Sequence, residues 1–422
     1  MTINDTIRSA MEEEIIDAER VLVPVEAVEA TVVRERSGPG TDDALAAGDD
    51  KQERRSLLRR IPRICVGLIG WLFGVCSMIV GLAILATIPV FQFLSLGYLL
   101  EASGRVGRSG RIRDGFIGID RFARVGSIVL GTTLAFMPVW FISSLTESSL
   151  ILNGPSRESR TMGLLLSFAS VVTVCHIVWA WFRGGRFRHF LWPAPIRLIK
   201  QLRKGGWLRE ARDQTCEFVE NLRLPFYFML GVRGFAGAIL WLFIPVTLLS
   251  LGTIDAQPIA ALVGLFGSFV MAMVVMYLPF LQTRFALEND FGEFFRISAV
   301  RSDFRRAPIA FWIALFCTLL FALPLYLLKA ELIPREAAWL PSLVFVVFMF
   351  PSRLAAGWAI GRAGKRELPR HALFRWSSRF AGVPVVGFYV GFVFLTQYVS
   401  WYGRWSLYEQ HAFLLPVPFL GL

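Results

Sequence analysis

From about residue 60 onward, long apolar stretches alternate with shorter polar stretches that are rich in arginine. Each apolar stretch holds about twenty residues, enough for a helix to cross a hydrocarbon core of ~30 Å. None alternates with the period of two that a membrane strand requires. We therefore predict eight spans: Ile64–Thr87, Val125–Leu145, Met162–Phe182, Phe226–Leu251, Ile259–Leu281, Ile309–Leu328, Leu340–Ile360 and Val383–Tyr402.

Two segments of different character follow from this pattern. Residues 61–422 are predicted to form an all-α, polytopic transmembrane bundle, because lipid offers backbone groups no partners outside a helix. Residues 1–60 hold too little apolar surface to fold alone, and we predict a disordered tail of mixed charge. Such a tail is a candidate docking segment for a protein partner.

The basic residues are distributed unevenly among the connections. Twenty-eight lysines and arginines lie in residues 98–124, 183–225, 284–307 and 353–380, whereas the other connections and the C-terminal tail hold five. Basic connections remain in the cytoplasm by the positive-inside rule. We therefore expect these four connections to share the cytoplasmic side of a cell membrane.

The segment before the first span conflicts with a simple topology. Residues 51–63 hold six basic residues and should also be cytoplasmic, yet one crossing cannot leave both ends inside. A break near Pro89 would let residues 61–100 enter and return as a re-entrant or paired helix. The alternative is a tail that is translocated against its charge.

Composition narrows the class of protein. The chain is 55% hydrophobic with a mean hydropathy of +0.54 and a net charge of +12. We assign this charge to topology, because no basic motif with a reading helix predicts nucleic-acid binding. The five cysteines are scattered without a C-x-x-C, so we expect no disulfide framework, metal site or cofactor. The acidic start of the chain predicts no cleavable signal peptide.

Several features repeat along the chain. The spans form four successive pairs of helices. The two helices of each pair are joined by one of the four basic connections, and these connections resemble one another, which suggests repeated hairpins.

The stretch "IPVFQFLSLGYLLEASGRV" resembles a bacterial family of polytopic membrane proteins of unknown function, through Pro89 followed by Gly97, Tyr98, Leu99 and Leu100. The resemblance implies a bacterial inner membrane and supplies no catalytic residues. The G-x-x-x-G pairs Gly70/Gly74 and Gly387/Gly391 predict close helix packing.

The first basic connection carries the most regular motif. Arg105, Arg108 and Arg111 each follow a glycine at three-residue intervals, and Arg113 lies beyond them. Glycine frees the backbone and guanidinium groups bind phosphate oxygens, so an anionic-lipid clamp held at the headgroups by Phe116 and Phe122 is one interpretation. The other is a flexible loop that only sets topology.

Two further arginines fall within or beside the spans. Arg233 and Arg353 either snorkel to the cytoplasmic face or line an inward-facing anion site. No span carries Asp or Glu in its core, which disfavours proton or sodium coupling through carboxylates.

These patterns leave two classes of function open. The first is a non-enzymatic membrane scaffold or accessory protein, since no catalytic motif is present. The alternative is a transporter or lipid-handling protein for anionic substrates, which would use Arg233, Arg353 or the Gly/Arg stretch 104–113. The sequence does not predict the oligomeric state.

Overall fold

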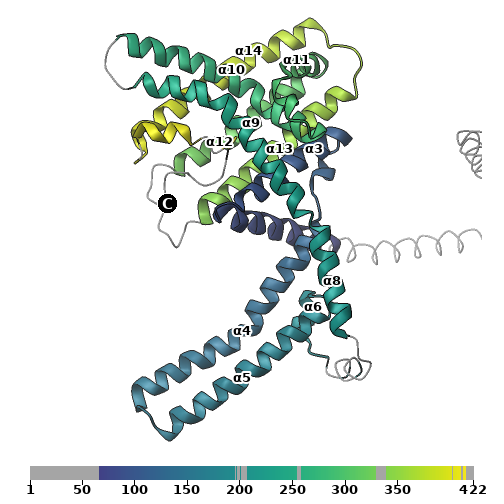
Figure 1. Ribbon diagram of the computed structural model, residues 1–422, viewed down its shortest axis with the longest axis vertical. Coiled ribbons are helices and arrows are strands. Elements are labelled where there is room, and N and C mark those ends of the chain that lie inside the picture. Colours follow the sequence, from purple (N-terminus) through teal and green to yellow (C-terminus); the bar gives the residue numbers. More distant parts are fainter. Residues whose placement is uncertain are drawn as a thin grey trace, which may run out of the picture. The chain divides into compact units, whose positions relative to one another are not determined.

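The computed structural model describes residues 66–194, 196, 200, 207–253, 258–328, 339–401, 403–409 and 412–414. Every regular element within these ranges is a helix, which confirms the predicted all-α class (Figure 1). The tail predicted at residues 1–60 lies outside the described residues.

Eight of the described helices are long and apolar enough to cross a membrane. They are Val66–Thr87, α4 (Ile119–Asn153), α5 (Arg157–Phe182), α9 (Leu224–Leu251), α10 (Pro258–Glu288), α12 (Pro308–Leu327), α13 (Trp339–Gly364) and α14 (Ala372–Val399). Each corresponds to one predicted span, so all eight are confirmed. Several run past the apolar window, because their ends continue into the arginine-rich connections.

Shorter helices occupy much of the basic connections. They are α3 (Gln92–Ser109), the 3-10 helix η1 (Ile112–Gly115), α6 (Phe187–Leu191), α8 (Trp207–Asn221), η2 (Phe291–Phe295) and α11 (Ile297–Arg306). A last 3-10 helix, η5 (Gly403–Tyr408), follows α14.

The chain turns back after the first span. The helix ends at Thr87, Val90 adopts a left-handed φ of 71°, and α3 begins at Gln92. The Tyr98 hydroxyl lies 2.9 Å from Sδ of Met78, and the Trp71 ring lies 5.3 Å from that of Phe116, beyond α3. The start of the first helix and the end of α3 therefore meet, as the paired-helix interpretation of residues 61–100 requires.

Close contact between backbones holds α3 inside the bundle. Most of its residues are buried, and it packs against α9, α10 and α13. A Cβ atom on Gly97 would overlap the carbonyl oxygen of Tyr227 on α9, and a Cβ on Gly231 would overlap the carbonyl oxygen of Phe93. Small residues at this crossing permit an approach that larger side chains would prevent.

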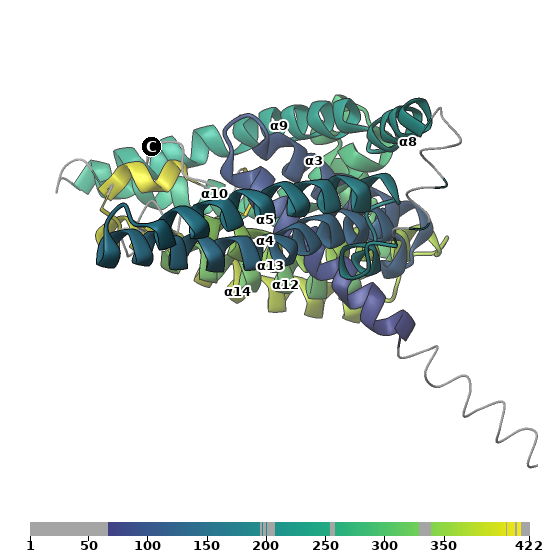
Figure 2. The same cartoon turned by 90° about the horizontal axis from the view of Figure 1, so that it is seen from below.

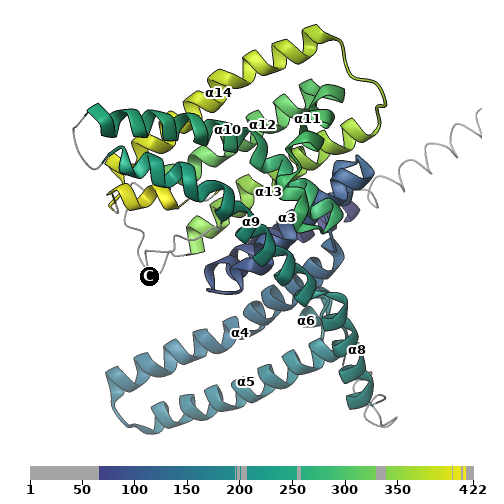
Figure 3. The ribbon, with the colours of Figure 1, turned by 45° about the horizontal axis from the view of Figure 1, so that its top comes forward.

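Consecutive spans pack as pairs. Contacts join α4 with α5, α9 with α10 and α12 with α13. These are not the predicted hairpins: each pair is joined by a connection poor in basic residues, whereas the prediction paired the helices on either side of a basic connection. Helices of their own lie within three of the four basic connections, which separates the flanking spans along the chain. Figures 1 and 2 show α4 and α5 side by side, and Figure 3 shows the same for α9 and α10. Pro279 and Pro351 leave α10 and α13 continuous, so the helix break lies near Pro89 and not at these two prolines. Duplication of an ancestral hairpin stays a prediction.

Candidate functional site

Hydrogen bonds between connections gather the four basic regions at one end of the bundle. Each bond joins residues far apart in the sequence, and together they link all four connections. The pairs are Arg108 Nη1 with the carbonyl of Leu287 at 2.8 Å, Lys365 Nζ with the carbonyl of Gly110 at 3.5 Å, the backbone N–H of Arg370 with the carbonyl of Arg305 at 2.8 Å, and Arg121 with the carbonyl of Asn221. We call this surface the basic end.

The Gly/Arg stretch 104–113 is mostly helical, which differs from the flexible loop that its glycines suggested. Gly104 and Gly107 lie within α3, where they face Ala286 and Leu287 on α10. Gly110 ends the helix with a left-handed φ of 67°, and its N–H donates to the carbonyl of Val106. The glycines therefore serve helix packing and helix termination.

A buried carboxylate holds two arginines of this motif. Oε1 of Glu101 lies 2.9 Å from Nε of Arg105 and 2.9 Å from Nη2 of Arg108, and the Glu101 side chain is 7% exposed. Arg108 also binds the C-terminal end of α10 through Leu287. Two of the residues predicted to clamp lipid phosphate thus have partners within the chain. The sequence analysis did not single out Glu101, although its i, i+4 spacing to Arg105 was a readable signal.

Phe116 and Phe122 pack into the protein, not flat at the headgroups as predicted. The Phe116 ring lies 5.2 Å from that of Phe350 on α13, and the Phe122 ring lies 5.7 Å from that of Tyr98. Both are partly buried against the main core. Aromatic partners on other helices hold the two rings there, which a single amphipathic stretch could not reveal.

A groove lies beside the remaining arginines of the motif. Arg111 precedes η1 and Arg113 belongs to it, and both side chains are exposed. Arg113 lines a groove of about 770 Å³ together with Arg124 of α4 and Arg186, the residue before α6. The start of the first helix forms its apolar wall, through Gly67, Gly70 and Trp71. The sequence analysis did not single out Arg124 or Arg186, because 62 positions separate them in the chain.

A second ion-pair cluster follows α10. Arg284 bridges Glu293 of η2 and Asp303 of α11, at 2.8 Å in each case. Arg296 pairs with the same Glu293, whose side chain is 1% exposed. Burial raises the pKa of the Asp303 carboxyl above its ordinary value, while Arg284 acts in the opposite direction. The cluster fixes the third basic connection to the end of α10.

Arg353 and Arg233 occupy different environments. Arg353 is 4% exposed and donates hydrogen bonds to Oε1 of Gln282 on α10 at 2.6 Å and to the carbonyl of Ala412 at 3.4 Å. It therefore lies within the bundle and does not snorkel. No carboxylate among the described residues lies within ion-pair distance of it. Arg233, by contrast, is exposed on α9, which is compatible with the snorkelling interpretation.

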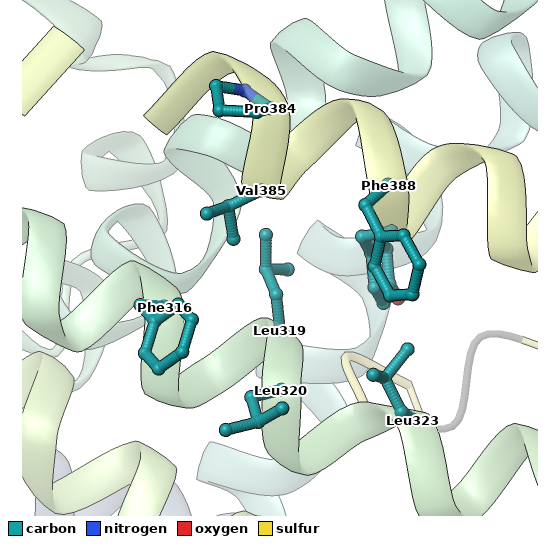
Figure 4. Close-up of a pocket in the computed structure, with 8 residues that line it drawn as sticks. Phe316, Leu319, Leu320, Leu323, Pro384, Val385 and Phe388 are labelled. Atoms are coloured by element: carbon teal, nitrogen blue, oxygen red, sulfur yellow. The ribbon is translucent and has the colours of Figure 1, made fainter. Parts of the chain in front are cut away.

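A smaller and entirely different pocket lies between α12 and α14. It has a volume of about 300 Å³ and is lined by apolar side chains such as Leu319, Val385 and Phe388 (Figure 4). The hydroxyl of Tyr389, another lining residue, is 2.9 Å from that of Tyr326. Such a lining accepts hydrocarbon and offers little to orient a polar ligand.

The fold defines an α-helical, multi-pass membrane protein. Residues 212–333 match the family described as "Protein of unknown function (DUF4013)". This match begins within α8, includes α9 to α12 and supports an uncharacterised family. It does not include the Pro89–Leu100 motif, so the resemblance based on that motif stays a prediction. No curated protein and no solved structure matches the chain.

Proposed function

We propose that the protein is a non-enzymatic membrane scaffold or accessory protein that presents its basic end to partners. One observation carries this proposal: hydrogen bonds from arginine and lysine side chains and from the backbone join the four basic connections into a single surface. A surface held by contacts between distant helices keeps its shape, as a binding platform requires.

The proposal includes an orientation. We place the basic end in the cytoplasm of a bacterial cell, with the bundle in the inner membrane. The excess of lysine and arginine at this end supports this orientation by the positive-inside rule. The return of the chain at Pro89 supports this orientation, because it would let the start of the first span lie at the same end and would account for the basic residues at 51–63.

Transport of an anion fits the geometry less well. A substrate would have to compete with Glu101 for Arg105 and Arg108, and with Gln282 and Ala412 for Arg353. Arg233 lies on an exposed face of α9. The arginines that the sequence offered for an anion path thus have internal partners or face away from the interior.

The scaffold proposal is tested by crosslinking in membranes. The full chain is compared with a variant in which residues 2–60 are replaced by a Gly/Ser linker, and with a variant of the basic end, Arg301→Glu with Arg305→Glu and Arg362→Glu. We expect a defined set of crosslinked proteins whose recovery falls several-fold in at least one variant. Equal recovery from all three chains, or uptake of an anion by vesicles that contain the purified protein, would overturn the proposal.

A further inference from the structure

The groove beside η1 combines two surfaces that a phospholipid needs. One wall consists of the first turns of the helix Val66–Thr87, where Trp71 is 44% exposed. A Cβ atom added at Gly67 or Gly70 would meet no other atom within 4 Å. The missing side chains at these glycines leave room along the helix. The opposite wall carries guanidinium groups.

Three arginines from separate elements converge on this groove. Arg113 comes from η1, Arg124 from the start of α4 and Arg186 from the residue before α6. Of the lining residues that the structure describes, Asp120 is the one that is acidic. Among the described residues none of the three guanidinium groups has a hydrogen-bond or ion-pair partner. Their state contrasts with that of Arg105 and Arg108, which share Glu101.

We propose that this groove binds one anionic phospholipid, with its phosphate between Arg113, Arg124 and Arg186 and an acyl chain along the Gly67–Trp71 wall. Guanidinium groups bind phosphate oxygens through paired hydrogen bonds. The apolar wall selects a lipid over a free anion, since a soluble phosphate would leave that wall in water. The groove lies at the basic end, where headgroups of the adjacent leaflet are located in the orientation given above. The site rests on the orientation proposed above but not on the scaffold role.

The test is native mass spectrometry of the full chain, purified in a neutral detergent, with phosphatidylglycerol, phosphatidylcholine or inorganic phosphate added. The groove variant is Arg113→Gln with Arg124→Gln and Arg186→Gln. Its matched control, Arg301→Gln with Arg305→Gln and Arg362→Gln, removes the same charge from exposed positions at the same end. A second pair, Gly70→Leu and Gly387→Leu, adds the same side chain inside the groove and on an open face of α14.

We expect the natural chain to retain one phosphatidylglycerol in preference to phosphatidylcholine. Each arginine near a lipid surface strengthens binding by about fivefold, so the groove variant should bind at least tenfold more weakly and the control within twofold of the natural chain. Gly70→Leu should weaken binding while Gly387→Leu does not.

Three results would overturn the assignment. They are an equal loss in the groove variant and its charge-matched control, no preference between the two lipids, and displacement of the lipid by millimolar inorganic phosphate. A monodisperse size-exclusion profile for every variant ensures that a loss of binding is not a loss of fold.

Discussion

Arg353 on α13 donates a hydrogen bond to Oε1 of Gln282 on α10, at 2.6 Å, although 71 residues separate them in the sequence. The amide nitrogen of the same Gln282 donates to the carbonyl of Phe413 at 2.9 Å, and Arg353 reaches the neighbouring carbonyl of Ala412. These bonds fasten residues 412–413 to the interior of the bundle. They also compensate a guanidinium group that burial has removed from water.

Replacing Gln282 with leucine should therefore destabilise the fold. The change leaves a buried charge without its strongest hydrogen-bond acceptor, and we expect a loss of about 1.5–3 kcal/mol. Gln397→Leu is the matched control, because Gln397 is buried on α14 and its amide nitrogen has no hydrogen-bond partner among the described residues. Thermal unfolding in detergent measures both. The double variant Gln282→Leu with Arg353→Met should lose less stability than the sum of the losses in the two single variants. A loss equal to that sum would contradict the contact.

A second prediction concerns Glu101. This carboxylate accepts from Arg105 and Arg108 at once, so Glu101→Gln should weaken both contacts, whereas Arg105→Gln leaves the bond to Arg108 in place. We expect the glutamate substitution to lower the thermal midpoint more than the arginine substitution, because the carboxylate is buried and Arg105 is partly exposed. The reverse order would mean that Glu101 does not organise the end of α3.

The third prediction addresses the crossing of α3 and α9. Gly97→Ala would place a Cβ against the backbone carbonyl of Tyr227, which cannot move without shifting α9, and overpacking of this kind costs about 1–3 kcal/mol. Gly387→Ala is the control, because a Cβ there meets no atom within 4 Å. Alanine favours a helix over glycine, so the control should unfold at the same or a higher temperature. Equal effects at the two positions would contradict the close crossing.

The eight spans could be predicted because each depends on local composition alone. A run of about twenty apolar residues has few alternatives in lipid, and proline at 89 has a direct effect on its own backbone. The positions of Gly104 and Gly107 could not be interpreted in this way. A glycine can make a loop flexible, or it can allow two helices to pack closely. Here the second role applies, because Gly104 and Gly107 face Ala286 and Leu287 on a helix about 180 residues further along the chain.

The G-x-x-x-G pairs illustrate the same limit. Gly74 packs closely against Ile119, as predicted, but Gly70, Gly387 and Gly391 face open space. A close helix crossing that these pairs did not predict instead involves Gly97 and Gly231, where added Cβ atoms would overlap the carbonyl oxygens of Tyr227 and Phe93. Arg353 was recognised as unusual from its place near a span, yet its partners Gln282 and Ala412 lie on other elements. Sequence thus located the charged residue but not the contacts that decide between snorkelling and burial.

The last prediction tests the membrane orientation with single cysteines in a chain whose natural cysteines are replaced by alanine. Arg305 and Arg362 lie at the basic end, whereas Arg157 begins α5 at the far end of the α4–α5 pair, and all three side chains are exposed. An impermeant maleimide added to intact cells should label Arg157→Cys and leave Arg305→Cys and Arg362→Cys unlabelled until the membrane is opened. Helices with about twenty apolar residues separate Arg157 from Arg305 and Arg362 by the full bilayer. Labelling of all three positions from one side would therefore rule out that α4 and α5 cross the membrane as a pair, and that the basic end is cytoplasmic.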